Sequence, residues 1–204
     1  MSNLINNIEA SYSNGFNIED EQLDVYENWE TYVDDIIDEA GWLGPMKTVK
    51  YLLDNTSFPT DADVADMGCG PGTAGIMLKG AGYTQVDGYD ICRHFLAKAK
   101  PFYRDVQYLD ITLDPIDKYY DVILASGLFD YGHLDAIAVE HLADSLKTDG
   151  ILIITVPNNN YMKDSGWDIQ QHLTLIDTIG PWDSMTVNNK KYSHMLQVFR
   201  NYKT

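Results

Sequence analysis

Short β-rich runs alternate with helical stretches from residue 63 onward, and this alternation constrains the fold more than any other feature of the chain. Each run ends near an Asp or a Gly, and a stretch with helical periodicity follows it. The pattern is typical of a parallel sheet whose strands are joined by crossover helices. The predicted strands cover residues 63–67, 86–89, 106–109, 120–125 and 151–156. The chain is therefore expected to form a doubly wound α/β sheet.

The stretches between and after these strands carry apolar residues at helical spacing. One predicted face is formed by Cys92, Phe95, Leu96 and Ala99 and ends at Pro101. Another is formed by Leu134, Ala138, Leu142 and Leu146 and ends near Gly150. Because Pro and Gly interrupt helices, we expect both boundaries there. A last helix is predicted around residues 169–179, followed by a hairpin of residues 184–187 and 195–202.

An amphipathic helix is predicted before the sheet, between residues 20 and 40. Its apolar residues recur at steps of three and four: Val25, Trp29, Val33, Ile36 and Ala40. Gly41 and Gly44 are expected to stop it. A second helix is expected to begin at Pro45 and to direct toward the core Val49, Leu52 and Leu53. Residues 1–59 thus form a predicted helical extension, and residues 60–204 the core of a single domain.

The charge of the chain bears on its partners. The 204 residues carry a formal net charge of -17, and such a field repels phosphate backbones and anionic membranes. We therefore expect neither nucleic acid nor membrane as a partner. Two cysteines do not make a disulfide framework, and the amino-terminal residues 1–10 have no signal-like basic and apolar regions, so a cytoplasmic protein is expected.

The strongest functional motif is the run from Asp66 to Gly72, directly after the first predicted strand. Ligands of doubly wound sheets bind beyond the carboxyl ends of the strands. Gly68, Gly70 and Gly72 allow the backbone to approach a ligand closely, and the helix that follows directs its N–H groups toward it. Asp90 ends the next strand, where a carboxylate can accept the hydroxyls of a ribose.

These features fit two kinds of cofactor. The residues from Gly70 to Gly75 also match the dinucleotide pattern G-x-G-x-x-G, so a nicotinamide-dependent oxidoreductase stays possible. Asp66 would lie beside the negative pyrophosphate of such a cofactor, which is unfavourable in a partly desolvated site. S-adenosylmethionine has no phosphate, and its ammonium group attracts a carboxylate. The charges favour S-adenosylmethionine.

Two later strand ends supply further candidates. Asp110 can accept the amino group of adenine while Ile111 covers the ring, although Asp110 fits a simple turn equally well. Ser126 follows the fourth predicted strand and is expected to form the floor of the pocket near the methionine moiety. Cys69 and Ile91, which neighbour the motif residues, complete the expected cofactor-binding set.

The sequence offers one candidate for a catalytic base and two candidate nucleophiles. His133 follows the fourth strand, where it can act as a base or merely start the next helix. Cys69 and Cys92 are at strand ends near the same cleft, and a nucleophilic role competes with that of small buried residues. No His pair has metal-ligand spacing, so no metal is expected.

Three motifs resemble those of the class I S-adenosylmethionine-dependent methyltransferases: residues 66–72, 86–90 and 146–152. The resemblance implies a seven-stranded sheet in the order 3-2-1-4-5-7-6 with the last strand antiparallel. Residues 26–34 and 41–45 are similar to the small Williams-Beuren syndrome region methyltransferase-like family, which suggests that Tyr32 and Trp29 close over the cofactor. Trp29 fits plain core as well. Glu27 and Glu30 depart from the pattern of that family.

The sequence therefore predicts transfer of a methyl group from S-adenosylmethionine to an acceptor by direct in-line displacement, with S-adenosylhomocysteine as product. The charge favours a small acceptor, neutral or cationic, bound near residues 129–133 and 158–161. The polar-Pro-Pro-Tyr tetrad of adenine-N6 methyltransferases is absent after the fourth strand, where Ala125 to Leu128 stand. A non-catalytic protein that binds S-adenosylmethionine is the main rival.

Overall fold

The computed structural model describes residues 26–129, 136–157, 169, 173–187 and 189–202. They form one seven-stranded sheet in the order β3-β2-β1-β4-β5-β7-β6. The strands are β1 Val64–Met67, β2 Val86–Asp90, β3 Asp105–Tyr108, β4 Tyr120–Ala125, β5 Leu146–Val156, β6 Thr174–Val187 and β7 Lys190–Arg200. Neighbouring strands from β3 to β5 are parallel, and β7 runs antiparallel to both β5 and β6. The fold class expected from the sequence is confirmed.

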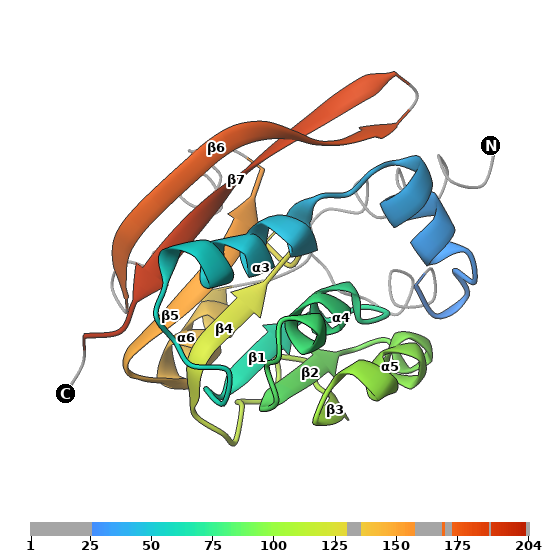
Figure 1. Cartoon of the computed structure of the whole chain (residues 1–204). Coiled ribbons are helices and arrows are strands. Elements are labelled where there is room, and N and C mark those ends of the chain that lie inside the picture. Colours follow the sequence, from blue (N-terminus) through green and yellow to red (C-terminus); the bar gives the residue numbers. More distant parts are fainter. Residues whose placement is uncertain (1–25, 130–135, 158–168, 170–172, 188, 203–204) are drawn as a thin grey trace.

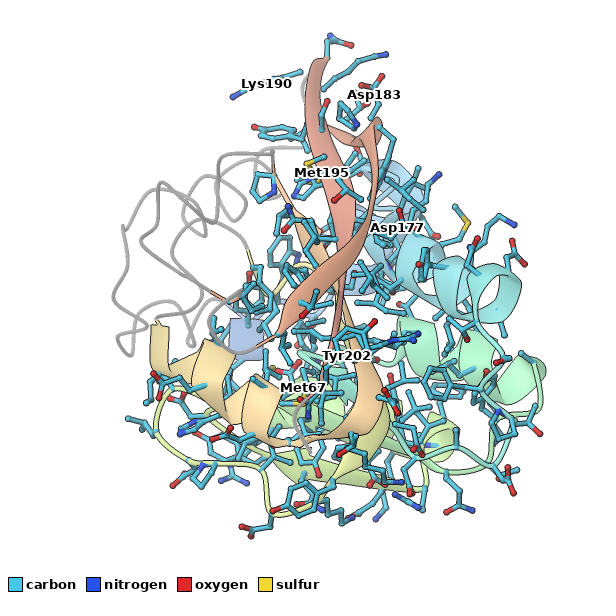
Figure 2. The ribbon with its side chains drawn as sticks, turned by 90° about the vertical axis from the view of Figure 1, so that its left-hand side faces the viewer. Met67, Asp177, Asp183, Lys190, Met195 and Tyr202 are labelled. Atoms are coloured by element: carbon cyan, nitrogen blue, oxygen red, sulfur yellow. The ribbon has the colours of Figure 1, made fainter. Side chains whose placement is uncertain are left out.

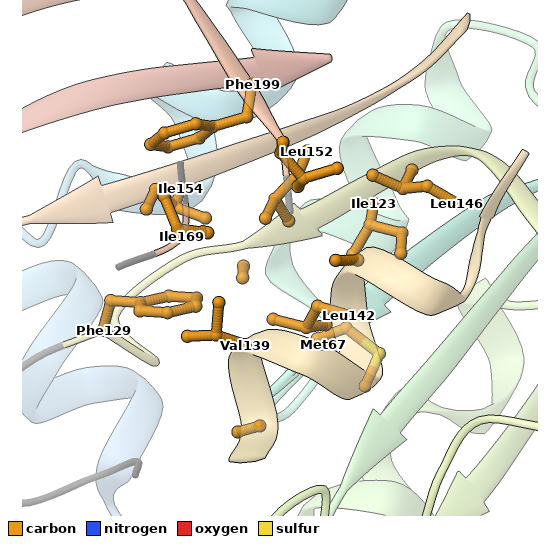
Figure 3. Close-up of a cluster of buried hydrophobic side chains, with 14 of the residues drawn as sticks. Met67, Ile123, Phe129, Val139, Leu142, Leu146, Leu152, Ile154, Ile169 and Phe199 are labelled. Atoms are coloured by element: carbon orange, nitrogen blue, oxygen red, sulfur yellow. The ribbon is translucent and has the colours of Figure 1, made fainter. Parts of the chain in front are cut away.

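Helices cover both faces of this sheet (Figure 1). The helices are α3 Gly44–Asn55, α4 Thr73–Gly80, α5 Arg93–Ala99 and α6 Ala136–Asp144. Residues of α3, α4 and α5 share one buried cluster with Ile151 and Ile153 of β5. Residues of α6 share another with Leu152 and Ile154, and Figure 3 shows the interdigitated side chains of this second cluster. Alternate residues of β5 thus face opposite layers, as the period of a strand requires.

Most predicted elements are present, with shifted ends. Helix α5 buries the predicted face and ends before Pro101, in a short 3-10 turn Lys100–Phe102. Helix α6 buries Ala138 and Leu142 as expected, but Leu146 belongs to β5 and pairs with Tyr120. The predicted helix face was therefore wrong at Leu146, because pairing with β4 begins immediately after α6. Leu134 is outside the described residues.

The helix predicted around residues 169–179 is wrong, because residues 174–187 form strand β6. Pairing with β7 continues along almost the whole length of β6 and is interrupted only by three register shifts. Thr174, Ile176 and Thr178 are β-branched, and β-branched residues favour strands. This preference agrees with the pairing of β6 with β7. The predicted hairpin exists but is longer. Figure 2 shows it rising from the body of the molecule, with Asp183 and Lys190 toward its tip.

The amino-terminal segment is not the single regular helix predicted for residues 20–40. A turn interrupts it at residues 28–31, and a π-helix, η1 Val33–Glu39, follows. The indole nitrogen of Trp29 and the hydroxyl of Thr31 both donate to Asp35 Oδ2, at 2.7 Å each, which favours this wider turn. Val33 is consequently 36% exposed, although the prediction had it on the buried face. Val25 lies outside the described part of the chain.

The segment between η1 and α3 also differs from expectation at two residues. Gly41, with φ +72°, ends η1 as predicted, whereas Gly44 begins α3 instead of stopping a helix. Val49 and Leu52 are fully buried, but Leu53 is 43% exposed and does not face the core. No helix in the described ranges is long and apolar enough to cross a membrane.

Candidate functional site

The glycine-rich loop after β1 is fixed to the end of β2. The N–H groups of Gly68 and Cys69 donate to the carbonyl of Tyr89, at 2.8 and 2.9 Å. The N–H of Gly70 donates to Asp90 Oδ2 at 2.8 Å. Asp90 therefore supports the loop directly, as well as lying beside it.

The loop is open to a ligand at one glycine and closed at another. A Cβ added at Gly70 would meet nothing within 4 Å, whereas one at Gly72 would lie 3.0 Å from Phe102 and 3.2 Å from Ala99. Both glycines have positive φ, +52° and +102°, which side chains of other residues adopt with strain. Gly70 is thus the point where a ligand can approach the backbone, and Gly72 is the point where α4 packs.

Asp66 is buried at the end of β1. Its Oδ2 accepts a hydrogen bond from the hydroxyl of Tyr103 at 2.5 Å. Burial raises the pKa of Asp66 to about 7, and the charge of Asp90 adds to this, while the bond from Tyr103 lowers it. The carboxyl group therefore titrates near neutral pH in the ligand-free protein.

In the described part of the chain, the hydrogen bonds to the Asp90 carboxyl group come from backbone donors. Besides Gly70, the N–H of Cys92 donates to its Oδ1 at 2.8 Å. Burial raises the pKa of Asp90 to about 6 against these hydrogen bonds, and Glu27 contributes a repulsive charge. Within the described residues, neither Asp66 nor Asp90 has a salt bridge to Lys or Arg. The buried carboxyl group of Asp66 and the half-buried one of Asp90 therefore face this site without a cation from the described part of the chain.

The turn after β4 packs against the glycine-rich loop. The side chain of Leu128 comes within 3.1 Å of a Cβ built at Gly68, and the N–H of Gly127 donates to Thr155 Oγ1 at 2.8 Å. The buried hydroxyl of Ser126 has no hydrogen-bond partner in the described structure. The turn therefore closes one side of the site and leaves a polar group for a ligand.

Asp110 and Ile111 follow β3. Asp110 Oδ1 accepts hydrogen bonds from the N–H and the hydroxyl of Thr112, at 2.9 and 2.7 Å, so this oxygen stabilises a turn. Ile111 is buried in the cluster that contains α6. The geometry shows the turn role of Asp110, and contact of either residue with adenine stays a prediction.

The amino-terminal segment docks on α5 beside Asp90. Glu27 accepts hydrogen bonds from the N–H groups of Arg93 and His94, at 2.6 and 3.2 Å. The ring of Tyr32 packs 4.7 Å from that of Phe95, and burial, followed by the charge of Asp90, raises the pKa of Tyr32. Tyr32 is thus brought to the predicted site. Trp29, at 3% exposure, lies in a buried cluster with Met185 and Val187 of β6, against which Tyr32 also packs, and this burial supports the core interpretation of Trp29.

The remaining candidates divide into buried and undescribed residues. Cys69 and Cys92 are buried, and burial raises both thiol pKa values, that of Cys92 to about 12. Neutral thiols suit small buried residues rather than nucleophiles. No group of three His, Cys, Asp or Glu residues in the described ranges could hold a metal ion. His133 and residues 158–161 lie outside the described residues, and Phe129 is fully buried in the core (Figure 3).

Tyr103 and Glu27 were not among the predicted site residues. Tyr103 follows the 3-10 turn after α5, and nothing in the local sequence points toward Asp66, 37 positions earlier. Glu27 carried a weak signal, because it departs from the amino-terminal pattern of the resembling family. Both contacts depend on tertiary packing, which the sequence pattern does not encode.

The site fits S-adenosylmethionine. Its ammonium group and ribose hydroxyls are donors, and the site offers Asp66, Asp90 and the unpartnered hydroxyl of Ser126 as acceptors. The open backbone at Gly70 provides the close approach. A pyrophosphate would add negative charge beside the carboxyl groups of Asp66 and Asp90, which disfavours a nicotinamide dinucleotide.

Comparisons with known proteins agree with this geometry. A family model described as a methyltransferase domain matches residues 44–199. No curated protein sequence matches the chain significantly. Many solved structures share the fold, at identities that show the fold alone.

Three of these structures cover most of the chain. A chain from the complex of the Haloferax volcanii Trm112 methyltransferase activator gives a TM-score of 0.66 at 14% identity, covering 87% of this chain and 98% of that one. A TehB-like SAM-dependent methyltransferase from Corynebacterium glutamicum gives 0.59 at 20% identity, covering 78% and 87%. Coclaurine N-methyltransferase, bound to N-methylheliamine and S-adenosylhomocysteine, gives 0.62 at 10% identity, covering 77% and 72%.

Proposed function

The chain belongs to the methyltransferase domain family, and we propose that it transfers a methyl group to a small-molecule acceptor by direct in-line displacement. Its cofactor is S-adenosylmethionine, in agreement with the neighbouring structures. The observation that carries the proposal is a pair of carboxyl groups, the buried Asp66 and the half-buried Asp90, beside an open glycine-rich loop and without a cation among the described residues.

Each predicted site residue has a proposed task in holding the cofactor. Asp66 binds the ammonium group. Asp90 accepts the ribose hydroxyls with the lone pairs that Gly70 and Cys92 leave available, since each carboxylate oxygen can accept two hydrogen bonds. The backbone of Gly68, Cys69, Gly70 and Gly72 surrounds the amino-acid part, Ile91, Asp110 and Ile111 surround the adenosine, and Ser126 and Tyr32 close the two sides.

When bound, the cofactor supplies an electrophilic methyl group on a sulfonium. In the proposed in-line displacement, an N, O or S atom of the acceptor would take this methyl group, and the electron pair of the broken bond would stay on sulfur. The protein contributes alignment and exclusion of water, for which the buried site and the docked amino-terminal segment are suited. His133 is proposed to accept the proton that the acceptor loses.

A small acceptor, neutral or cationic, agrees best with the charges. The formal net charge of -17 and the carboxylates at the site attract cations and repel polyanions. In the coclaurine N-methyltransferase structure the bound organic ligand is likewise a small molecule, N-methylheliamine. The acceptor is proposed to bind near residues 129–133 and 158–161.

The amino-terminal extension is proposed to act as a cap over the cofactor. Tyr26 and Tyr32 pack on Phe95 of α5, and the backbone of Thr186 in β6 donates to the carbonyl of Ala40. A relationship with the Williams-Beuren syndrome region methyltransferase-like family, whose amino-terminal pattern this segment resembles, is part of this proposal. Residues 1–59 would form the cap and residues 60–204 the core, with α3 packed on the core side.

Transfer of label from S-adenosylmethionine tests this function. The protein is incubated with methyl-labelled S-adenosylmethionine together with one of three fractions, small metabolites, protein or RNA, in separate reactions. Label is expected in small metabolites, and the Asp90→Ala variant serves as the control with strongly reduced transfer. Label found chiefly in RNA would contradict the electrostatic argument. Intact cofactor binding with no label in any fraction would favour the non-catalytic rival.

A further inference from the structure

Tyr103 fills the space beneath the glycine-rich loop. A Cβ built at Gly75 of α4 would lie 2.4 Å from Tyr103 Cζ, and one at Gly88 of β2 would lie 3.3 Å from its Cδ1. Two positions without side chains therefore accommodate this ring. The ring is buried, so its hydroxyl group can reach only partners supplied by the protein interior.

The direction of both hydrogen bonds of the Tyr103 hydroxyl is fixed. It accepts from the N–H of Gly75 at 3.0 Å, which leaves its one hydrogen for Asp66 Oδ2 at 2.5 Å. A hydrogen bond donated to a carboxylate stabilises the ionised form. Tyr103 thus links the first turn of α4 to the carboxyl group at the end of β1.

We propose that Tyr103 is a positioning residue that keeps Asp66 poised to ionise, so that capture of the ammonium group of the cofactor is coupled to the release of a proton. The inference rests on the proposed function. The O–H bond of the Asp66 carboxyl group breaks, the proton passes to solvent, and the carboxylate pairs with the ammonium group. No oxidant or reductant takes part.

The groups that face Asp66 support this coupling. The carboxylate of Asp90 repels its negative charge, and the thiol of Cys69 is held neutral by its raised pKa. Among the described residues, Tyr103 is the one donor that forms a hydrogen bond with the Asp66 side chain. Burial sets the pKa of Asp66 at about 7 with Tyr103 in place. Removal of the hydroxyl therefore moves the pKa of Asp66 upward.

The test is the affinity for S-adenosylhomocysteine between pH 6 and pH 8.5, measured by titration calorimetry for the wild type and for Tyr103→Phe. Loss of a charge-assisted bond shifts the midpoint of the pH profile upward by about one unit, which weakens binding about tenfold at pH 6 and hardly at pH 8.5. The number of protons released at neutral pH, obtained from buffers of different ionisation enthalpy, changes with the same midpoint. A merely structural tyrosine would weaken binding equally at every pH.

Three further measurements separate the possible failures. Tyr83→Phe is the matched control, because this buried tyrosine donates to the carbonyl of Phe58 and its loss should leave the profile unchanged. In an Asp66→Asn background, Tyr103→Phe should shift nothing further. In the ligand-free protein, Tyr103→Phe should extend the loss of stability with rising pH to higher pH. A wild-type profile for Tyr103→Phe would overturn the inference, whereas absence of binding by the wild type would overturn the proposed function instead.

Discussion

Strands β1 and β2 each have an Asp near both ends, and the Asp residues at the two ends of the sheet have different hydrogen-bond partners. At the amino end, Asp87 accepts two hydrogen bonds from the guanidinium of Arg104, at 2.8 and 2.6 Å, and others from Tyr120 and Lys118. Asp63, just before β1, pairs with Lys147 and Arg104. At the carboxyl end, Asp66 and Asp90 have only neutral donors among the described residues.

The pKa values record this difference. Hydrogen bonding from Lys147 lowers the pKa of Asp63. Burial would raise the pKa of Asp87, but the bonds from Arg104, Tyr120 and Lys118 outweigh it, and the pKa is lowered. At Asp66 and Asp90 the effect of burial outweighs that of the hydrogen bonds, and the pKa values rise to about 7 and about 6. A buried carboxylate with its cation in place stabilises the fold, whereas one without a cation marks a site for a ligand.

The largest expected effect is a loss of folding stability when an Asp at the amino end of the sheet is removed. Asp87→Ala leaves Arg104 and Tyr120 without their shared acceptor, and removal of one partner from a buried ion pair costs about 3–5 kcal/mol. The free energy of unfolding from urea denaturation measures the loss. Asp183→Ala, which breaks an exposed pair with Lys191, is the control and should cost under about 1 kcal/mol. Equal losses in the two variants would mean that the Asp87 cluster is not structural.

At the carboxyl end, loss of Asp90 should weaken ligand binding more than folding. Asp90→Ala removes a charge-assisted acceptor for the ribose hydroxyls and a support for Gly70, so the affinity for S-adenosylhomocysteine should fall by about 1.5–3 kcal/mol. Calorimetric titration measures the affinity. An unchanged affinity would mean that Asp90 only holds the loop.

Asp66→Asn should stabilise the folded protein above neutral pH, whereas Asp87→Ala destabilises it. The folded protein holds the Asp66 proton more tightly than the unfolded chain, so the wild type loses stability as pH rises from about 4 to about 7. The variant lacks that loss and should be more stable at pH 8 by about 1–3 kcal/mol, part of the shift converted at 1.36 kcal/mol per unit. Urea denaturation at pH 5 and pH 8 gives the comparison. A variant less stable than the wild type at pH 8 would contradict this account of Asp66.

The smallest effect concerns the segment that covers the carboxyl end. Glu27→Ala removes the acceptor for the first N–H groups of α5, which should lower the unfolding free energy by about 0.5–1 kcal/mol. Thermal unfolding monitored by circular dichroism measures it. Glu39→Ala, in the same segment, has no described contact with α5 and is the control; an equal loss there would remove the assigned role of Glu27.

The parts of the fold that sequence predicted are those that depend on local patterns. The parallel strands and α5 follow from the periodicity of their apolar residues, and the glycine-rich loop follows from backbone requirements at Gly70 and Gly72. The first part of β6, residues 174–179, was mistaken for a helix because its pairing with β7 lies outside the local pattern. The π-helix Val33–Glu39 likewise depends on a side-chain bond from Trp29 to Asp35.

The site shows the same division. Asp66 and Asp90 could be predicted because strand ends of a parallel sheet converge at one end. The donor to Asp66, the hydroxyl of Tyr103, could not, because it comes from a residue 37 positions later in the chain. The charge partners of Asp87 were missed for the same reason, since Arg104 and Lys118 come from two different loops.

The central claim is that two carboxylates at the carboxyl end of the sheet bind a cationic cofactor. Its most direct test is the thermal midpoint of the wild type, measured with each candidate ligand. A ligand that binds only the folded state raises this midpoint by mass action. The account predicts that S-adenosylhomocysteine raises it at pH 8, while NAD and NADP at the same concentration leave it unchanged. A rise with NAD and none with S-adenosylhomocysteine would contradict the account.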